Sequence, residues 1–561
     1  MKTLVFLTVL VVTVISDPIN LNPTEDWWTH AVFYQIYPLS YKDTDGNGYG
    51  DLTGITEKLD YLKDLGIDGV WLSPIYPTPL ADYTYDISNY RDIDPLFGSL
   101  EIFDAFVARA KELGIRVIMD YVPDYTSDEH DWFSQSVQKV DPYTDYYMWD
   151  DGKVDDDGNR LPPNGWQSVF GGAAWLFNED RQQWFLHQFT PKQPDLNWTN
   201  TDLYEFLVDV MRYWLDKGID GFRVDAVPWL FEGSFDNNDT VSPQNLPETY
   251  NAVKIMRSVA DEKTEEYGET KILMLEVYGT EDQVMEYYGT PDSPGGHFPF
   301  NFRFITDLNG SSNARDFSRV LNNYLEHVSQ AEDRVPNWVL GNHDQHRIAD
   351  RYHPKLVEGM HFLSLLLPGV ALTFNGEEIG MEDTYITWEQ CLDPQGVNAG
   401  EQGYLNRTRD LERTPFQWDD TDNAGFSDGE TTWLPVNPNY KELNAELENA
   451  ANKSHIQVYK NLIQLRKEAT FKNGATEIAA LTDNVLAFTR TLDGEDTYVI
   501  VLNLGDAAET VDLTEAFSYL PDQLKMVAVS IYSEHEVGMV HDTTNLEIQA
   551  KDSFVFTSAT Q

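Results

Sequence analysis

The amino-acid sequence predicts an α/β protein built on a (β/α)₈ barrel, and three observations lead to this fold class. Three segments repeat one pattern, in which a helix ends at a glycine and a short apolar run follows: residues 62–73, 110–122 and 214–226. Glycine is a common stop after a helix because it tolerates the left-handed conformation. Apolar runs with little alternation are typical of parallel strands covered on both faces. Eight strand candidates, most of them separated by helical stretches, favour a closed barrel over an open doubly wound sheet.

The eight strand candidates follow one another along most of the chain. Besides the three segments above they are AVFYQIYP (31–38), KILMLEVYG (271–279), FPFNFRFI (298–305), NWVLGNHD (337–344) and VALTFNGEE (370–378). They place the barrel at residues 24–124 and 190–470.

Two segments depart from this alternation, and the end of the chain follows another pattern. Residues 125–189 are rich in Asp, Gly, Pro and Trp, which predicts a subdomain inserted after the third strand. A second irregular insertion covers about residues 379–450. Residues 471–561 contain short alternating runs, which predict an antiparallel β domain.

Composition limits the kinds of partner that this protein can have. The chain of 561 residues has 39 Lys and Arg against 93 Asp and Glu, a formal net charge of −54. Nucleic acids and anionic membrane surfaces attract basic proteins, so neither is an expected partner. Aromatic residues make up 13 % of the chain, a supply that suits a large core and also suits stacking on sugars.

The first residues of the chain predict secretion. Residues 1–16 combine Lys2, an apolar run and a small-residue cleavage site, as in a signal peptide, and the run is too short to span a membrane comfortably. Cys391 is the only cysteine, which excludes an intrachain disulfide. Glycosylation sequons occur at Asn197, Asn238, Asn309, Asn406 and Asn452. We expect a secreted, extracellular glycoprotein.

A loop directly after the first strand has the pattern of a calcium site. The run DTDGNGYGD offers oxygen ligands at alternate positions, with glycines that allow a sharp turn. The expected ligands are Asp43, Asp45, Asn47, the carbonyl of Tyr49, and Asp51. Gly54 stands where an EF-hand has its bidentate glutamate, so the loop is not an EF-hand. A simple polar turn is the alternative to this structural calcium site.

A pair of charged residues stands out in the fourth strand, GIDGFRVDAVPWL (218–230). Arg223 and Asp225 point to the same side of that strand, where they form either a structural ion pair or part of an active site. In a barrel of this class, active residues lie at the carboxyl ends of the strands. The polar residues of the predicted strands fall at those ends, which favours an active site: Asp120, Asp225, Glu276, His343 and Asp344.

Three of these residues fit the chemistry of glycoside hydrolysis. Asp225, Glu276 and Asp344 end strands four, five and seven. A retaining glycosidase needs one carboxylate as nucleophile and one protonated carboxyl as acid. Carboxyls on one rim shift each other's pKa and can keep one protonated near neutral pH. The alternative is a metal site, and the nearby Arg223 and His343 argue against it.

At this point the sequence resembles the α-amylase family of glycoside hydrolases, in particular the branch of oligo-1,6-glucosidases and insect maltases. The runs GFRVDA, LEVYG, GNHD and QPDLNW appear in the order of that family and span nearly the whole chain. The resemblance implies that Asp225 is the nucleophile, Glu276 the acid/base and Asp344 the stabiliser of the transition state. It also implies that Arg223 orients the nucleophile, that His343 binds sugar hydroxyls, and that no organic cofactor is needed.

The resemblance further implies a closed pocket for the terminal glucose. Asp82 and Tyr85 would line it, and Arg413 would pair with Asp82 at its base. Phe170 and Phe189 resemble the aromatic walls of such pockets. A closed pocket predicts an enzyme that removes one glucose at a time from a disaccharide or short oligosaccharide.

The sequence departs from the family pattern at three positions. The usual run DLVPNHTS is DYVPDYTS here, so Asp124 and Tyr125 replace an asparagine and a substrate-contacting histidine. Leu39 replaces an arginine in YPLSY. Loss of one hydrogen bond to the transition state would cost on the order of 2–4 kcal/mol. The sequence therefore leaves three hypotheses: a secreted maltase- or sucrase-like α-glucosidase, a weakened or inactive relative with a binding or receptor-like role, and a transglucosylating sucrose isomerase.

Overall fold

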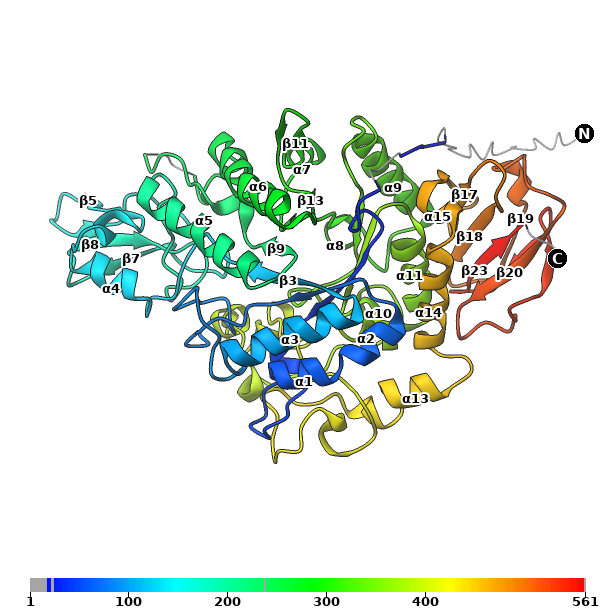
Figure 1. Ribbon diagram of the computed structural model, residues 1–561, viewed down its shortest axis with the longest axis horizontal. Helices are drawn as coiled ribbons and strands as arrows, with labels where there is room; N and C mark the ends of the chain where they lie inside the picture. Colours follow the sequence, from blue (N-terminus) through cyan, green and yellow to red (C-terminus); the bar gives the residue numbers. More distant parts are fainter. Residues whose placement is uncertain (1–17, 22–24, 237–238, 559–561) are drawn as a thin grey trace, which may run out of the picture.

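The computed structural model describes residues 18–21, 25–236 and 239–558. The predicted signal peptide, residues 1–16, lies outside this part of the chain, as does the sequon at Asn238. A central barrel carries a small subdomain on one side and a β domain on the other (Figure 1). The predicted fold class is confirmed.

Eight parallel strands form the barrel sheet, in the order β13-β10-β9-β3-β2-β1-β15-β14. Their bounds are β1 Val32–Ile36, β2 Gly69–Leu72, β3 Arg116–Tyr121, β9 Gly221–Val224, β10 Ile272–Leu275, β13 Phe298–Pro299, β14 Asn337–Val339 and β15 Val370–Phe374. The expected strand at 298–305 is wrong in its extent, because β13 has only two residues and the helix α8 (Arg303–Thr306) takes the end of that segment. Strands as short as β13 leave little backbone for pairing with a second neighbour.

The ring of strands is therefore completed by a side chain between β13 and β14. The Asn337 side chain donates a hydrogen bond to Pro299 O at 2.7 Å and accepts one from Asn301 N at 2.8 Å. The hydroxyl of Tyr324 accepts a further bond from Asn337 N at 3.1 Å. Asn337 is fully buried, so its amide replaces the missing backbone ladder at this seam.

Helices follow the strands on the outside of the barrel (Figure 1). They are α1 Leu52–Glu57, α2 Leu59–Leu65, α3 Leu100–Leu113, α5 Thr201–Asp216, α6 Pro247–Tyr267, α7 Glu281–Glu286, α9 Ala314–Val328, α10 Ile348–Arg351, α11 Val357–Leu366 and α14 His455–Arg466. Gly66 and Gly114 end α2 and α3 with φ of 93° and 69°, and Gly218 follows α5 with φ of 98°. The glycine stops read from the sequence are left-handed as expected.

The segment inserted after β3 forms a small subdomain of its own. It contains α4 (Asp131–Val137), a sheet of three short antiparallel strands and a two-stranded ribbon. The sheet consists of β4 Trp149–Asp150, β7 Trp175–Asn178 and β8 Gln183–Leu186, and the ribbon of β5 Lys153–Val154 and β6 Arg160–Leu161. Three of its residues, Val169, Phe170 and Phe189, form part of the wall of the cavity that is described in the next section.

The second insertion is mostly irregular, with α12 (Pro394–Ala399) and α13 (Ala445–Ala450) as its α-helices. It packs on the loop after β1, because Phe426 O accepts a hydrogen bond from Asp43 N at 2.9 Å and Gly48 O accepts one from Trp433 N at 3.0 Å. Short 3-10 helices occur here and elsewhere at Pro38–Ser40, Tyr143–Asp145, Val227–Trp229, Pro354–Leu356, Glu377–Ile379, Trp388–Gln390, Tyr404–Asn406, Asp422–Gly425, Pro438–Lys441 and Leu513–Glu515.

The chain ends in an antiparallel β domain that follows α15 (Ala469–Asn473). Six strands pair in the order β16-β17-β18-β23-β20-β21, and β19 pairs with β22. Their bounds are β16 Ala475–Ala480, β17 Val485–Thr491, β18 Tyr498–Asn503, β19 Glu509–Val511, β20 Gln523–Val529, β21 Val540–Asp542, β22 Leu546–Ile548 and β23 Ser553–Thr557. A separate two-stranded ribbon belongs to the barrel domain and consists of β11 Gly289–Thr290 and β12 Ser293–Pro294.

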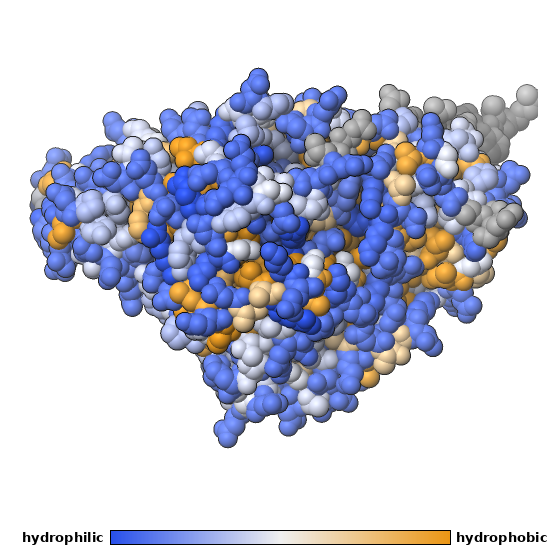
Figure 2. Space-filling model, in the orientation of Figure 1, coloured by the Kyte–Doolittle hydropathy of each residue, from blue (hydrophilic) through white to orange (hydrophobic). Residues whose placement is uncertain are grey.

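The outer surface is largely polar on the face that Figure 2 shows. Hydrophilic side chains cover most of the face in view, with apolar ones gathered in small groups between them (Figure 2). Over the described ranges, no helix combines the length and the apolar character that a membrane span requires.

Candidate active site

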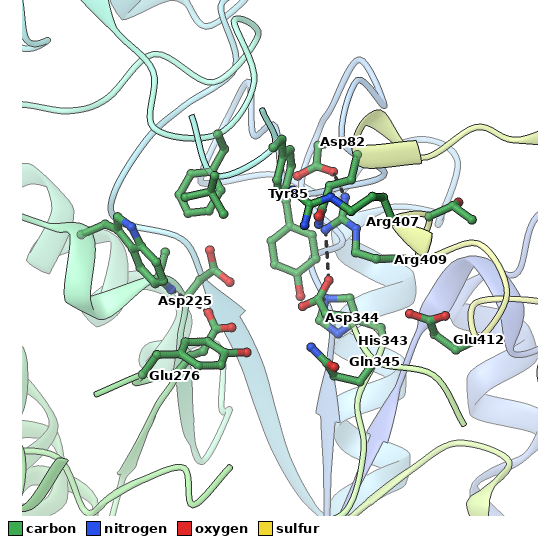
Figure 3. A pocket seen from close by; sticks show the side chains of 18 of the residues that line it. Asp82, Tyr85, Asp225, Glu276, His343, Asp344, Gln345, Arg407, Arg409 and Glu412 are labelled. Carbon is green, nitrogen blue, oxygen red and sulfur yellow. Dashed lines mark hydrogen bonds and ion pairs between the residues drawn. The ribbon is translucent and has the colours of Figure 1, made fainter. Parts of the chain in front are cut away.

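A cavity of about 560 Å³ opens at the carboxyl ends of the barrel strands, and the predicted carboxyls lie in its wall. Asp225 directly follows β9, Glu276 directly follows β10, and Asp344 belongs to the loop after β14. The carboxyls of Asp225 and Glu276 face the cavity from one side and Asp344 from the other (Figure 3). Parallel strands end at one rim, so residues far apart in the sequence meet here.

Most of the residues predicted for the site line this cavity. Of the predicted residues, the wall contains Asp82, Tyr85, Tyr125, Phe170, Phe189, Asp225, Glu276, His343 and Asp344. Arg223 and Arg413 are buried behind the wall and do not line it. Sequence reasoning missed other lining residues, among them Trp229, Tyr278, Gln345, His346, Arg407, Arg409 and Glu412.

Arg223 joins three carboxyls beneath the cavity floor. Its Nη1 pairs with Asp225 Oδ1 and, at 2.9 Å, with Asp120 Oδ1, while its Nη2 lies 2.9 Å from Glu276 Oε2. Arg223 is 1 % exposed, so these pairs are held in a dry environment where charge interactions are strong. Arg223 and Asp225 therefore form both a structural ion pair and part of the candidate active site, because the ion pair orients Asp225 in the cavity wall.

Tyr125 holds the second oxygen of Asp225. Its hydroxyl donates a hydrogen bond of 2.9 Å to Asp225 Oδ2. Burial, together with the negative charge of Asp225, raises the pKa of Tyr125 well above its usual value, so the phenol keeps its proton. The residue that departs from the family pattern therefore contacts the carboxyl to which the resemblance assigns the role of nucleophile.

The surroundings of Glu276 favour its protonated form. Burial raises the pKa of Glu276 to about 8 despite the positive charge of Arg223, and the charges of Asp225 and Asp344 add to the rise. Its Oε2 accepts a hydrogen bond of 2.9 Å from Ala226 N. Ala226 has φ of 47°, a left-handed conformation that costs an alanine roughly 1 kcal/mol and turns this amide toward Glu276. A carboxyl that is protonated at neutral pH can act as a general acid.

Asp344 is held in the opposite state. Arg409 Nη1 and Arg413 Nη2 lie 3.0 and 2.7 Å from its Oδ1. Burial alone would raise the pKa of Asp344, but the nearby positive charges outweigh this effect and hold that pKa below its usual range. The cavity therefore contains one carboxyl that stays ionised opposite one that stays protonated.

His343 is fixed as a neutral ring. Gln35 Nε2 lies 2.8 Å from His343 Nδ1, so this nitrogen accepts and Nε2 carries the proton. The ring stacks on Tyr85 at 5.1 Å with an interplanar angle of 3°. Burial lowers the pKa of His343 well below its usual value. His343 can therefore donate a hydrogen bond from Nε2 without adding charge.

The predicted pair between Asp82 and Arg413 is wrong, and Arg409 takes the place of Arg413. Arg409 Nη2 lies 2.7 Å from Asp82 Oδ1, and the same nitrogen pairs with Asp393. Arg413 instead donates from Nε to His343 O at 2.6 Å and binds Asp344. Both arginines lie in the irregular run TRDLERTP, where backbone conformation rather than spacing decides which one reaches Asp82. An ion pair at Asp82 exists as expected, with a different cation.

Aromatic rings form the wall of the cavity next to this pair. Phe189 packs on Tyr125, Phe170 and Trp229 with ring centroids 5.0, 5.5 and 5.7 Å apart. The Arg409 guanidinium lies 4.7 Å from the centroid of the Phe170 ring. These faces offer the apolar surface on which a sugar ring can stack, and they hold Arg409 in place.

Asp124, the other departure from the family pattern, is fully buried behind the cavity. Neither of its carboxyl oxygens has a hydrogen-bond partner. Burial, followed by the charges of Asp195 and Glu232, raises the pKa of Asp124 well above its usual value. Because buried carboxylates repel one another, this group must hold protons or a cation at neutral pH.

The predicted calcium loop has a geometry that fits a cation. Carboxylate oxygens of Asp43, Asp45 and Asp51 lie within 4.8 Å of one another, and Asn47 and Tyr49 belong to the same turn. Asp43 accepts hydrogen bonds from Gly46 N and Gly48 N at 2.8 Å each. Gly48 has φ of 91°, and a Cβ there would lie 2.7 Å from Thr431 O, so glycine is required. Hard oxygen ligands of this kind suit calcium.

If this loop binds calcium, we predict that removing the ion lowers the melting temperature by a few degrees, because the three carboxylates would then repel one another. A ligand at 100 times its dissociation constant stabilises a protein by about 2.7 kcal/mol. The measurement is calorimetric melting with calcium and with a chelator, and the Asp43→Asn variant should show no difference between the two. Equal melting temperatures in the native protein would contradict the calcium site.

Comparisons with known proteins agree with this site. A family model described as the alpha amylase catalytic domain matches residues 35–474. Maltase 1 of Drosophila virilis is 44 % identical over 540 residues, which cover 93 % of this chain and 85 % of that protein. An alpha-glucosidase of Apis mellifera is 39 % identical over 577 residues, covering 100 % and 99 % of the two chains.

This chain is also similar to solved structures. The crystal structure of the trehalulose synthase of Pseudomonas mesoacidophila superposes with a TM-score of 0.82 at 31 % identity and covers 95 % of this chain and 100 % of its own. The match to the family model, residues 35–474, includes every barrel strand except the first residues of β1. The carboxyls of the cavity also lie within this match. The chain therefore belongs to the α-amylase family of glycoside hydrolases.

Proposed function

We propose that this protein is a secreted, exo-acting, retaining α-glucosidase that releases α-glucose from the non-reducing end of maltose, sucrose and short oligosaccharides. The observation that carries the proposal is the cavity itself, in which a protonated Glu276 lies beside an Arg223-held Asp225 and an Asp82–Arg409 pair closes one end. Relatives named maltases and alpha-glucosidases support the same activity.

Each carboxyl has a role that follows from its surroundings. Asp225 attacks the anomeric carbon, and Glu276 gives its proton to the oxygen of the departing sugar, which leaves a glucosyl ester on Asp225. Glu276, now ionised, takes a proton from water as that water attacks the ester, and the two displacements restore the α configuration. Asp344, which stays ionised, stabilises the positive charge that develops on the sugar ring.

The closed end of the cavity supports the exo mode. Arg409 pairs with both Asp82 and Asp344, and these three charged side chains form one part of the cavity wall. Carboxylates and guanidinium groups bind the hydroxyls of a terminal sugar strongly, and a longer chain cannot pass.

The hydrogen bond between Tyr125 and Asp225 favours a second candidate function, that of a catalytically weakened relative with a binding role. A hydrogen bond to a charged group contributes about 1.5–3 kcal/mol, and it makes the carboxylate a weaker nucleophile. A third candidate, transfer of glucose to a sugar acceptor, uses the same carboxyls and differs in whether water or a sugar reaches the ester.

One assay separates these candidates. The secreted full-length protein is incubated with p-nitrophenyl α-glucoside, maltose, sucrose and isomaltose, and the products are followed by NMR. We expect α-glucose as the first product and no turnover by the Asp225→Asn variant. Turnover no higher than in this variant on every substrate would favour the binding role, and β-glucose would exclude retention. Isomerised sucrose without free glucose would assign glucosyl transfer.

Replacement of Tyr125 should raise the rate of the first step. In the Tyr125→Phe variant the nucleophile loses its hydrogen bond, and in Tyr125→His it gains the side chain usual in the family. We expect kcat/KM for p-nitrophenyl α-glucoside to rise by up to about tenfold in both, within the range that one hydrogen bond allows. Steady-state kinetics measure the change, with Tyr278→Phe, at another ring of the cavity wall, as the matched control. A tenfold fall instead would mean that the phenol stabilises the transition state.

A further inference from the structure

A second group of titratable side chains lies at the rim of the cavity, outside the three catalytic carboxyls. Ligand atoms of His346, Asp383 and Glu412 lie within 4.8 Å of one another. His346 Nδ1 is 2.6 Å from Asp383 Oδ2 and 3.8 Å from Glu412 Oε2. His346 comes from the loop after β14 and the two acids from the segment after β15, and both His346 and Glu412 line the cavity.

Glu412 is the member of this group that hydrogen bonding leaves unexplained. It is 1 % exposed, and its Oε2 has no hydrogen-bond partner. A buried polar atom without a partner costs about 1–3 kcal/mol, and more if it is charged. This oxygen faces an imidazole nitrogen and a second carboxylate, which is the environment that a bound cation would complete.

We propose that His346 Nδ1, Asp383 Oδ2 and Glu412 Oε2 bind a divalent transition-metal cation of the zinc class, with a fourth position open to the cavity. One imidazole and two carboxylates suit zinc, cobalt or nickel, whereas calcium prefers oxygen ligands alone. Three protein ligands and one open position are the usual arrangement of an accessible zinc site. The donor set separates this site from the all-oxygen loop at Asp43–Asp51.

Neighbouring groups fix the direction of the ligands. Asp383 Oδ1 accepts a hydrogen bond of 2.8 Å from Arg347 N, and Asp350 Oδ2 accepts one of 2.7 Å from Asp383 N. Hydrogen bonds of this kind fix the direction of a ligating carboxylate. Two guanidinium groups act on these ligands: that of Arg413 is paired with Asp344, and that of Arg347, close to Asp383 and Glu412, donates a hydrogen bond to Asn375 O. The cation replaces the proton shared by His346 and Asp383, and it also displaces the proton on Glu412, whose pKa burial raises well above its usual value. Binding therefore releases protons and strengthens as the pH rises.

A cation at this site would join two walls of the cavity. His346 lies two residues beyond Asp344, and Glu412 lies between Arg409 and Arg413, which both pair with Asp344. A metal bond between His346 and Glu412 therefore ties the Asp344 loop to the segment that carries both arginines. Because His346 and Glu412 line the cavity, the open position faces it, and water or a sugar hydroxyl could complete the coordination there.

The test is a cobalt titration of full-length protein that is saturated with calcium and carries no polyhistidine tag. Visible absorption of bound Co²⁺ reports nitrogen and oxygen ligation without any activity assay, and calorimetry gives the stoichiometry. We expect one Co²⁺ per chain, displaced by Zn²⁺. The His346→Gln and Glu412→Gln variants should each weaken binding at least tenfold, and Asp43→Asn should leave it unchanged.

Melting curves recorded without metal show that the variants fold, and Glu412→Gln keeps the size of the side chain in case His346→Gln does not fold. Unchanged cobalt binding in either folded variant would overturn the proposal. Loss of binding in Asp43→Asn alone would assign the metal to the calcium loop and overturn it equally. If the native protein shows no absorption from bound cobalt, the proposal is also overturned.

Discussion

In the Glu276→Gln variant, kcat/KM on maltose and sucrose is expected to fall by a factor of about 10²–10⁴, which is the usual contribution of general acid catalysis. Glutamine keeps the size of the side chain and cannot supply the proton that the departing sugar needs. Burial raises the pKa of Glu276 to about 8, so the acid is available below that pH and is lost above it. In the native enzyme kcat/KM should therefore fall as the pH rises through about 8, and this fall should be missing in the variant.

The leaving group supplies the control for this prediction. p-Nitrophenolate departs readily without a proton, so the loss on p-nitrophenyl α-glucoside should be much smaller than the loss on maltose. Azide should also restore turnover, because a small anion can attack the glucosyl ester without help from a base. An equal loss on all substrates, or a pH profile that keeps its alkaline limb, would mean that Glu276 is not the acid.

The Arg409→Met variant should lose both substrate binding and stability. Arg409 pairs with Asp82, Asp344 and Asp393, all from a position that is 7 % exposed. Removing one partner of a buried ion pair costs about 3–5 kcal/mol, since the carboxylates are left buried and unpaired. We expect a lower melting temperature and a fall of roughly 10²–10³ in kcat/KM, comparable with the loss of one transition-state donor.

Arg407 provides the matched comparison for Arg409. It lines the same cavity two residues earlier in the chain but is exposed. The Arg407→Met variant should keep its melting temperature and most of its activity. If the two variants behave alike in calorimetry and steady-state kinetics, the pocket is not closed by the Asp82–Arg409 pair.

The parts of the site that are fixed by strand periodicity could be predicted from the sequence. Asp225 and Glu276 had to meet because their strands are neighbours in a parallel barrel and both side chains follow the last strand residue. The glycine after each helix fixed where those strands begin. Topology brings such residues together whatever the details of packing.

The parts that depend on loop conformation could not be predicted. Nothing in TRDLERTP tells which arginine reaches Asp82, because that run has no regular period. The bond between Tyr125 and Asp225 depends on the orientation of one ring in the loop after β3. The contact of His346 with Glu412 depends on how the long segment after β15 folds back over the barrel. A sequence pattern carries no signal for such contacts.

The seam at Asn337 has a consequence for how the barrel comes apart. A ring of strands has no edges, but this sheet is a strip, and hydrogen bonds of the Asn337 amide join its two end strands, β13 and β14. If that latch opens, the peptide groups of both end strands become available to other chains, the usual starting point of edge-to-edge aggregation. Asn337 does not line the cavity, so its part in keeping the end strands together is separate from the chemistry of the site.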